Sequence, residues 1–167
     1  MNKLFQPSKR TPRLIKALDQ AVMRLDQTRI VPHSSDSFAP LGEALGWVTK
    51  LDNDFVETHG AAYCKTRDNH EFGGVVLGQR FARNLFEHNS QAIDLVDVGG
   101  GMCFPMRFPI CPFELKWKPL SKLPKPELRK KLVEDAYVKN VENRLARETL
   151  REALGFFLAI IHSGESH

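Results

Sequence analysis

Apolar residues recur every three to four positions over most of this chain, which is the spacing of one face of an α-helix. A first helix is predicted to begin at Thr11, with Pro12 in its first turn, where a missing N–H costs nothing. A second is predicted from about residue 41 to Phe55, and its continuation to Tyr63 is left open. A third is predicted over residues 75–89.

The period then changes to the alternation of a β-strand. Residues 92–98 are rich in Ile, Leu and Val, three glycines follow at 99–101, and residues 113–118 alternate apolar and polar side chains. This pattern predicts a small hairpin-like insertion over about 92–118. We expect the insertion to be a decoration beside the helices.

The helical spacing returns after a proline-bounded linker at 119–126 and continues over 127–161, as one long helix or as two broken near Asn140 or Asn143. The sum is a mainly α fold, an up-and-down bundle of four or five helices with a β-hairpin-like insertion. With 167 residues, 42% of them hydrophobic, the chain suits a single domain over 1–167, preceded by a loose N-terminal arm at 1–10.

Composition limits the class of protein. The longest apolar stretch, 153–161, is far shorter than the roughly 18 residues that span a bilayer, and the first residues lack the apolar core of a signal peptide. We therefore expect a cytoplasmic protein without a membrane partner. The three cysteines form no CxxC pair, which disfavours a disulfide framework and a structural zinc site, so no metal or cofactor is expected.

The net charge is +4, and the basic residues gather in a stretch at 116–131 and in a second cluster at Lys9, Arg10, Arg13 and Lys16. A solvated surface explains such a run, and so does a surface that contacts the phosphates of a nucleic acid. On the second interpretation Lys116, Lys118 and Lys130 are candidate substrate-binding residues.

The glycine-rich segment 95–103 resembles the first motif of class I methyltransferases, in which an apolar strand leads into a turn that holds S-adenosylmethionine. That motif needs a helix directly after the turn and several more strand–helix units. Here Phe104 and Pro105 follow, and the later residues show mainly helical spacing. We expect a tight turn between two short strands rather than a cofactor site.

Residues 83–88 carry the most suggestive chemistry. An arginine at 83 can hold phosphate oxygens, a histidine at 88 can transfer protons near neutral pH, and Asn84 lies one helical turn before His88 on the same face. Arg83 is about 100° round from Asn84, but its length allows it to reach the same site. From spacing alone, the alternative is that these are ordinary polar residues on an exposed helix.

The run Arg83-Asn84-Leu85-Phe86-Glu87-His88 resembles the signature of the HEPN family, in which an arginine and a polar residue precede a histidine late in an interior helix of a small bundle. The resemblance implies a metal-independent ribonuclease with Arg83, Asn84 and His88 as catalytic residues. It implies RNA as substrate, a homodimer that forms one cleft and, for toxin members, an antitoxin partner. The insertion at 92–118 departs from the simplest members.

Arg80, one turn before Asn84, is a further candidate for substrate binding. The competing interpretation is a non-catalytic helical module that binds a partner protein or nucleic acid through the basic stretch. Trp47 and Trp117 can stack on unpaired bases, but packing in the core is their expected role. His33, His59 and His70 are scattered and are expected on the surface or in loops.

Overall fold

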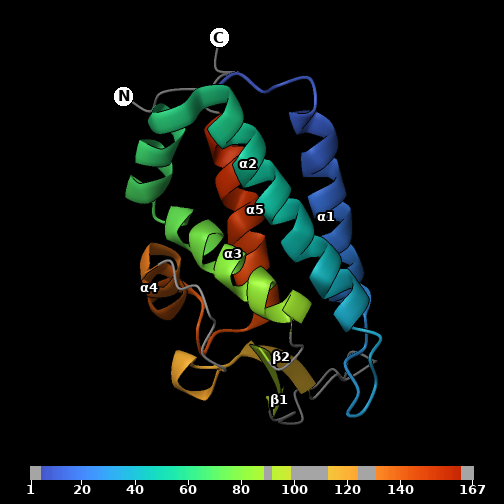
Figure 1. Cartoon of the computed structure of the whole chain (residues 1–167). Coiled ribbons are helices and arrows are strands. Elements are labelled where there is room, and N and C mark those ends of the chain that lie inside the picture. Colours follow the sequence, from blue (N-terminus) through green and yellow to red (C-terminus); the bar gives the residue numbers. More distant parts are fainter. Residues whose placement is uncertain (1–4, 89–91, 99–112, 124–130, 163–167) are drawn as a thin grey trace, which may run out of the picture.

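The computed structural model describes residues 5–88, 92–98, 113–123 and 131–162, and within them the chain forms a mainly helical bundle with a two-stranded hairpin, as predicted (Figure 1). The elements follow in the order α1 Thr11–Gln27, α2 Phe38–Asn69, α3 Gly73–His88, β1 Ile93–Asp97, β2 Phe113–Trp117, a short 3-10 helix Leu120–Lys122, α4 Lys131–Asn140 and α5 Ala146–His162.

Helices α1, α2 and α5 form the long part of the bundle (Figure 1). Pro12 lies in the first turn of α1, as predicted, and the helix ends where Thr28 turns to extended φ/ψ. The apolar face of α1 is buried at Leu18, Val22 and Leu25. The amphipathic spacing in the sequence therefore corresponds to the face that packs against α2 and α5.

Helix α2 is longer than predicted and bends at Gly60, whose φ of 55° and ψ of −133° lie outside the helical region. Glycine adopts positive φ without the penalty of a Cβ atom, so this position permits the sharp change of direction. The segment after the bend carries Tyr63 and Arg67 inward, and both are buried. An arginine on the inner face disturbs the apolar period there, which is why the pattern did not extend the helix to Asn69.

Aromatic side chains fill the centre of the bundle, where α2 meets α5. The rings of Phe55 and Phe157 stack with centroids 5.9 Å apart, and Phe55 and Tyr63 stack at 5.2 Å. Phe156 is also fully buried. Burying one such side chain stabilises a fold by about 1.5–3 kcal/mol, so this group anchors α5 to both halves of α2.

Helix α4 packs closely on α3 because Gly78 has no side chain. A Cβ atom at Gly78 would lie 2.6 Å from Val141 Cγ2 and 3.0 Å from the Ala136 carbonyl oxygen. Beyond α4 the chain turns at Asn143, which has a φ of 62°, and re-enters a helix at Ala146. The C-terminal region therefore forms two helices, the second of the two arrangements that the sequence left open.

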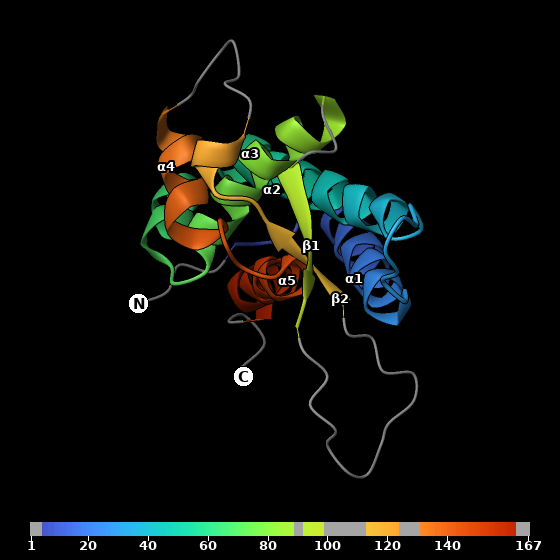
Figure 2. The ribbon, with the colours of Figure 1, turned by 90° about the horizontal axis from the view of Figure 1, so that it is seen from below.

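Strands β1 and β2 pair antiparallel across one end of the bundle, from Ile93 opposite Trp117 to Asp97 opposite Phe113 (Figure 2). The far edge of β2 is bonded to the turn before α5, since Trp117 N–H donates to the Arg144 carbonyl and Asn143 N–H to the Trp117 carbonyl. Trp117 is 1% exposed and its Nε1–H donates to Thr149 Oγ1 at 2.9 Å.

The expectation that the insertion is a decoration is therefore wrong for the part of the hairpin that adjoins the helices, because that end of both strands is part of the core. The reason is the tryptophan, which supplies a large apolar surface and also a donor that α5 satisfies. The turn expected at residues 99–101 and the rest of 99–112 lie outside the described residues.

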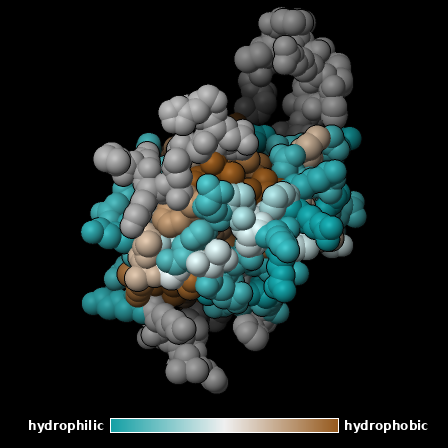
Figure 3. Space-filling model, turned by 90° about the horizontal axis from the view of Figure 1, so that it is seen from above, coloured by the Kyte–Doolittle hydropathy of each residue, from teal (hydrophilic) through white to brown (hydrophobic). Residues whose placement is uncertain are grey.

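The N-terminal residues 5–10, expected to belong to a loose arm, pack against α2 instead. Phe5 is buried against Phe55 and Tyr63, and Ser8 Oγ donates to a carboxylate oxygen of Asp54 at 2.8 Å. Seen from above, this end of the bundle is mostly hydrophilic, with hydrophobic areas between the hydrophilic residues (Figure 3). No helix in the described part of the chain has the length and apolarity needed to cross a lipid bilayer.

Candidate functional site

The residues of the 83–88 motif occupy the last two turns of α3. Asn84 is exposed, and the side chain of Arg83 is 32% exposed. Arg83 Nη2 donates to Glu87 Oε1 at 2.6 Å, one turn further along the helix. His88 is the final residue of α3, and its side chain lies outside the described part of the structure.

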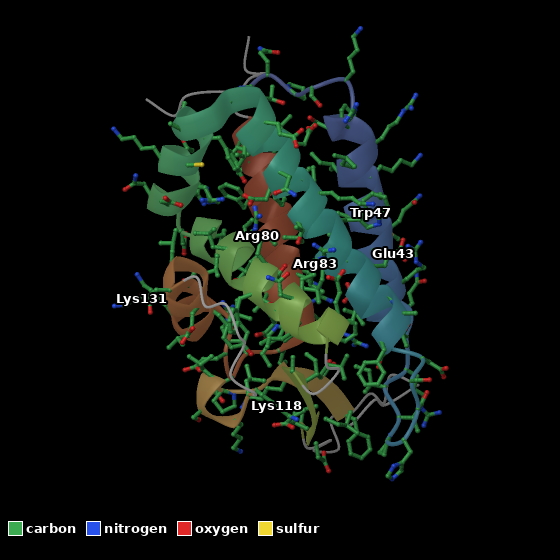
Figure 4. The ribbon with its side chains drawn as sticks, viewed as in Figure 1. Glu43, Trp47, Arg80, Arg83, Lys118 and Lys131 are labelled. Atoms are coloured by element: carbon green, nitrogen blue, oxygen red, sulfur yellow. The ribbon has the colours of Figure 1, made fainter. Side chains whose placement is uncertain are left out.

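A row of charged side chains runs along α3. Arg80, Arg83 and Glu87 follow one another at intervals of three and four residues, so they form a single row on the side of the helix toward α2. Asn84 is about 100° round from Arg83 but only one turn after Arg80, and it is exposed. The structure thus places Arg83 with Arg80 and Glu87, with Asn84 at the exposed edge of this row. Figure 4 shows the two arginines where α3 passes α2.

Arg80 is held by a buried carboxylate on α2. Its Nη1 donates to Asp52 Oδ2, and 33% of the Arg80 side chain is exposed. Asp52 is completely buried and also accepts hydrogen bonds from Tyr63 Oη at 2.7 Å and Arg67 Nη1 at 2.9 Å. A buried carboxylate is tolerated only with such partners, so Arg80 belongs to an internal network as well as to the surface.

The network changes the pKa values of its members in the direction that keeps it intact. Burial, together with the charge of Asp52, raises the pKa of Tyr63, so its hydroxyl remains a donor. Burial lowers the pKa of Arg67, but the charge and hydrogen bonds of Asp52 more than offset this, and the net pKa is raised. Both partners of Asp52 on the far side of Gly60 therefore stay protonated, and the bend in α2 is clamped.

Some polar atoms under the arginine row have no hydrogen-bond partner in the described structure. Both amide atoms of Gln79, which is 0% exposed, are unpaired, and so is the buried Nε of Arg83. Gln79 precedes Arg83 by one turn, on the same side of α3. An unpaired buried polar group costs about 1–3 kcal/mol, so these atoms destabilise the packing beneath the arginine row.

The predicted substrate-binding lysines are found at the hairpin end of the bundle. Lys116 is half-buried on β2, and Lys118 Nζ lies 3.4 Å from Asp94 Oδ1. Lys130 lies outside the described residues, while Lys131 is exposed at the start of α4 (Figure 4). Part of the charge of the basic stretch is therefore offset by Asp94.

The lysines are connected to α3 through α4. Tyr137 Oη donates to the Lys118 carbonyl at 2.6 Å, and the ring of Tyr137 lies 5.1 Å from that of Phe81 on α3. Lys118 is thus fixed beside α4, on the opposite side of α3 from the arginine row. Asn84, which is exposed, lies on α3 between the arginines and Phe81, the residue that packs toward α4.

Sequence reasoning missed a second polar group, between α1 and α2. Arg24 Nη2 donates to Glu43 Oε1 at 2.5 Å, and Trp47 Nε1 donates to the same oxygen at 3.3 Å. Burial raises the pKa of Glu43, but the hydrogen bonds from Arg24 and Trp47 lower it more. The one sequence signal was the spacing of Glu43 and Trp47, one helical turn apart, which is common in helices.

A hollow of about 390 Å³ lies beside this group. It is bounded by the end of α1, the loop before α2 and the first turns of α2, and its lining residues are Arg24, Gln27, Thr28, Asp36, Ala39, Pro40 and Glu43. Positive, negative and amide side chains therefore line a space of the size that small ligands occupy.

Among the described residues, no three His, Cys, Asp or Glu side chains are grouped closely enough to hold a metal ion. His59 lies within α2, and one of its ring nitrogens is 2.9 Å from the Gln6 carbonyl oxygen. His70 lies at the end of α2, and its Nδ1 accepts a hydrogen bond from the Phe72 N–H. Both histidines hold local structure, whereas the sequence left them as scattered surface residues. No family model, curated protein or solved structure matches the chain.

Proposed function

We propose that this chain is an endoribonuclease of HEPN type, which cleaves RNA by attack of a 2′-hydroxyl on the adjacent phosphate without a metal ion. The observation that carries the proposal is the surface position of Arg83 and Asn84 on the last turns of α3, with His88 ending the same helix. This is the order and the helix position of the motif that the sequence resembles.

Each residue has one task in the proposed reaction. Arg83 holds the phosphate oxygens and stabilises the charge that develops on them. Asn84 positions the attacking nucleotide, and His88 transfers protons. The 2′-oxygen forms a bond to phosphorus as it loses its proton, and the bond from phosphorus to the 5′-oxygen breaks as that oxygen gains one. The products are a 2′,3′-cyclic phosphate and a free 5′-hydroxyl.

The positions of the positively charged side chains around α3 support an RNA substrate. Arg80 and Arg83 lie where α3 passes α2, whereas Lys118 follows β2 and Lys131 begins α4 (Figure 4). An RNA backbone that crosses the end of α3 can meet positive groups on both sides of the scissile phosphate. Glu87 and Asp52 hold the two arginines in place, which lowers the cost of ordering them on binding.

The homodimer and, for a toxin, the antitoxin partner are part of the same proposal. The exposed surface of α3 at Asn84 is the part that a second copy would border if two motifs share one cleft. A sedimentation measurement of the purified chain tests the dimer, and a monomer that cleaves RNA at full rate contradicts it.

Cleavage of a fluorescent single-stranded RNA by the purified chain tests the assignment of roles. We expect His88→Ala to lower the rate by about 10²–10⁴-fold and Arg83→Ala to lower it comparably. Arg13→Ala and His33→Asn are matched controls, because Arg13 and His33 are both exposed and lie away from α3. Cleavage that survives His88→Ala unchanged rejects the assignment.

A second candidate function is a non-catalytic module that binds a partner protein or nucleic acid. The observation that favours it is that Arg80 and Arg83 each have a carboxylate partner already, whereas Lys131 and Lys122 are exposed. Charge reversal at Lys116, Lys118 and Lys130 should then weaken RNA binding and flatten its salt dependence. Unchanged affinity and salt slope would exclude this surface.

A further inference from the structure

Trp47 differs from Trp117 in its surroundings. Trp117 is enclosed, whereas Trp47 is partly buried on the outer part of α2, where its Nε1–H is fixed by Glu43. Figure 4 shows Glu43 and Trp47 on the α1 side of α2, while Arg80 and Arg83 lie toward α3. The indole is therefore held in one orientation and is only partly covered.

One face of the Trp47 ring lies under the side chain of an exposed lysine. The ammonium of Lys50, an exposed residue, lies 4.3 Å from the ring centroid. An exposed cation–π contact is weak, and a base that stacks on an indole gains more. A nucleobase can therefore displace Lys50 from the ring, and the freed ammonium can contact a neighbouring phosphate.

The surface on both sides of Trp47 leaves room for a single strand of nucleic acid. On one side is the 390 Å³ hollow, which shares Glu43 with the tryptophan and adds Arg24 and Asp36 as further polar groups. On the other side is Gly46, where an added Cβ atom would meet nothing within 4 Å. Because Gly46 has no side chain, the surface of α2 is depressed next to Trp47, on the side toward α3.

From these observations we propose that Trp47 and the adjoining hollow form a subsite for an unpaired nucleobase of single-stranded RNA. The base stacks on the indole, and its polar edge meets Arg24 and Glu43. The subsite selects single strands because the bases of a duplex are already stacked and paired. It rests on the proposed function, since it binds the substrate that α3 is proposed to cleave.

Binding of a fluorescent oligouridylate, measured by anisotropy with every protein in the His88→Ala background, tests the subsite. We expect Trp47→Leu to weaken binding about 5- to 100-fold, and Trp47→Phe, which keeps a ring, to weaken it less. Met23→Ala, at an exposed apolar residue of α1, is the matched control and should bind normally. Circular dichroism with a thermal melt confirms that each variant is folded.

Two further probes separate stacking from charge. Two control ligands are used: the oligonucleotide backbone without its bases, and the oligouridylate annealed to its complement. Each should bind equally to Trp47→Leu and to the parent. Iodide should quench Trp47 in the free protein and less in the complex, because Trp117 is buried in both. Three results overturn the subsite. They are equal oligouridylate affinity for Trp47→Leu and the parent, a loss of affinity for the base-free oligonucleotide as large as that for the oligouridylate, and no oligouridylate binding by the parent.

The two proposals fail in different ways. If Trp47→Leu binds normally while His88→Ala abolishes cleavage, the subsite is wrong and the ribonuclease stands. If Trp47→Leu loses single-strand binding although no variant cleaves RNA, the subsite stands and the chain is a binding module.

Discussion

Arg83 donates a 2.6 Å hydrogen bond to Glu87 one turn later on α3, and this contact holds the guanidinium at the surface of the helix that also exposes Asn84. An ion pair between exposed residues four apart contributes only about 0.3–0.5 kcal/mol to stability. Its importance therefore lies in the orientation of Arg83 and in the charge that it offsets.

Replacement of Glu87 by glutamine should separate these two effects. Glu87→Gln removes a negative charge beside Arg83 while the amide can still accept a hydrogen bond. We expect tighter RNA binding and a steeper loss of affinity with salt, and a change in stability below about 0.5 kcal/mol. Fluorescence anisotropy at several salt concentrations measures both quantities. An affinity and salt slope equal to those of the parent would show that RNA does not approach Arg83.

Loss of the buried carboxylate at the centre of the α2–α3 network should be far more damaging. Asp52→Asn leaves the guanidinium of Arg67, which is 7% exposed, with only the half-exposed Asp68 as an anionic partner, and breaking a buried pair costs about 3–5 kcal/mol. Urea unfolding monitored by circular dichroism measures this loss. The matched control is Asp19→Asn on the exposed face of α1, which should change stability by less than about 0.5 kcal/mol. Equal stability of the two variants would contradict the structural role of Asp52.

The bend in α2 predicts a contrast between two glycines. Gly60 has a φ of 55°, whereas Gly155 lies inside α5, and an added Cβ atom would touch nothing within 4 Å at either position. Gly60→Ala should therefore cost about 1–3 kcal/mol through backbone strain alone, and Gly155→Ala should stabilise the fold by about 0.5–1 kcal/mol. Thermal unfolding of both variants measures the contrast. A Gly60→Ala protein as stable as the parent would mean that α2 is not bent there.

The two tyrosines predict how stability depends on alkaline pH. Burial, with the charge of Asp52, raises the pKa of Tyr63, and burial, with Glu142 and Asp94, raises that of Tyr137. Because both folded pKa values lie above the unfolded value of about 10, this contribution to stability is complete below pH 10 and is lost as the pH rises toward the folded values. Tyrosinate absorbance should appear only with unfolding. Titration of Tyr63 near pH 10 in the folded protein would refute the buried Asp52 network, and titration of Tyr137 there would refute the burial of its ring beside α3.

Most of the fold could be predicted because burial follows the apolar period. Leu18, Val22 and Leu25 of α1 are buried as their spacing indicates, and the strands lie where alternation begins. The second half of α2 could not be predicted, because Arg67 faces inward and its burial depends on Asp52, fifteen positions earlier. Periodicity of single residues does not reveal a polar pair that forms only when a helix bends.

The candidate site was predictable in part. The sequence placed Arg83 about 100° from Asn84, and in the structure Asn84 is exposed while Arg83 is half-buried and pairs with Glu87. That Arg80 is bound to a buried aspartate was not visible, since Asp52 and Arg80 are far apart in sequence. The group around Glu43 and Trp47 depends on α1 lying beside α2, which brings Arg24 within hydrogen-bond distance.

The chemistry of the cleaved ends tests the ribonuclease proposal most directly. Single-stranded RNA is incubated with the purified chain in the presence of a metal chelator, and the ends of its fragments are identified by mass spectrometry. The account predicts fragments with 2′,3′-cyclic phosphates and 5′-hydroxyls from the parent, and none from His88→Ala. Intact RNA with the parent chain, or fragments that carry 5′-phosphates, would contradict it.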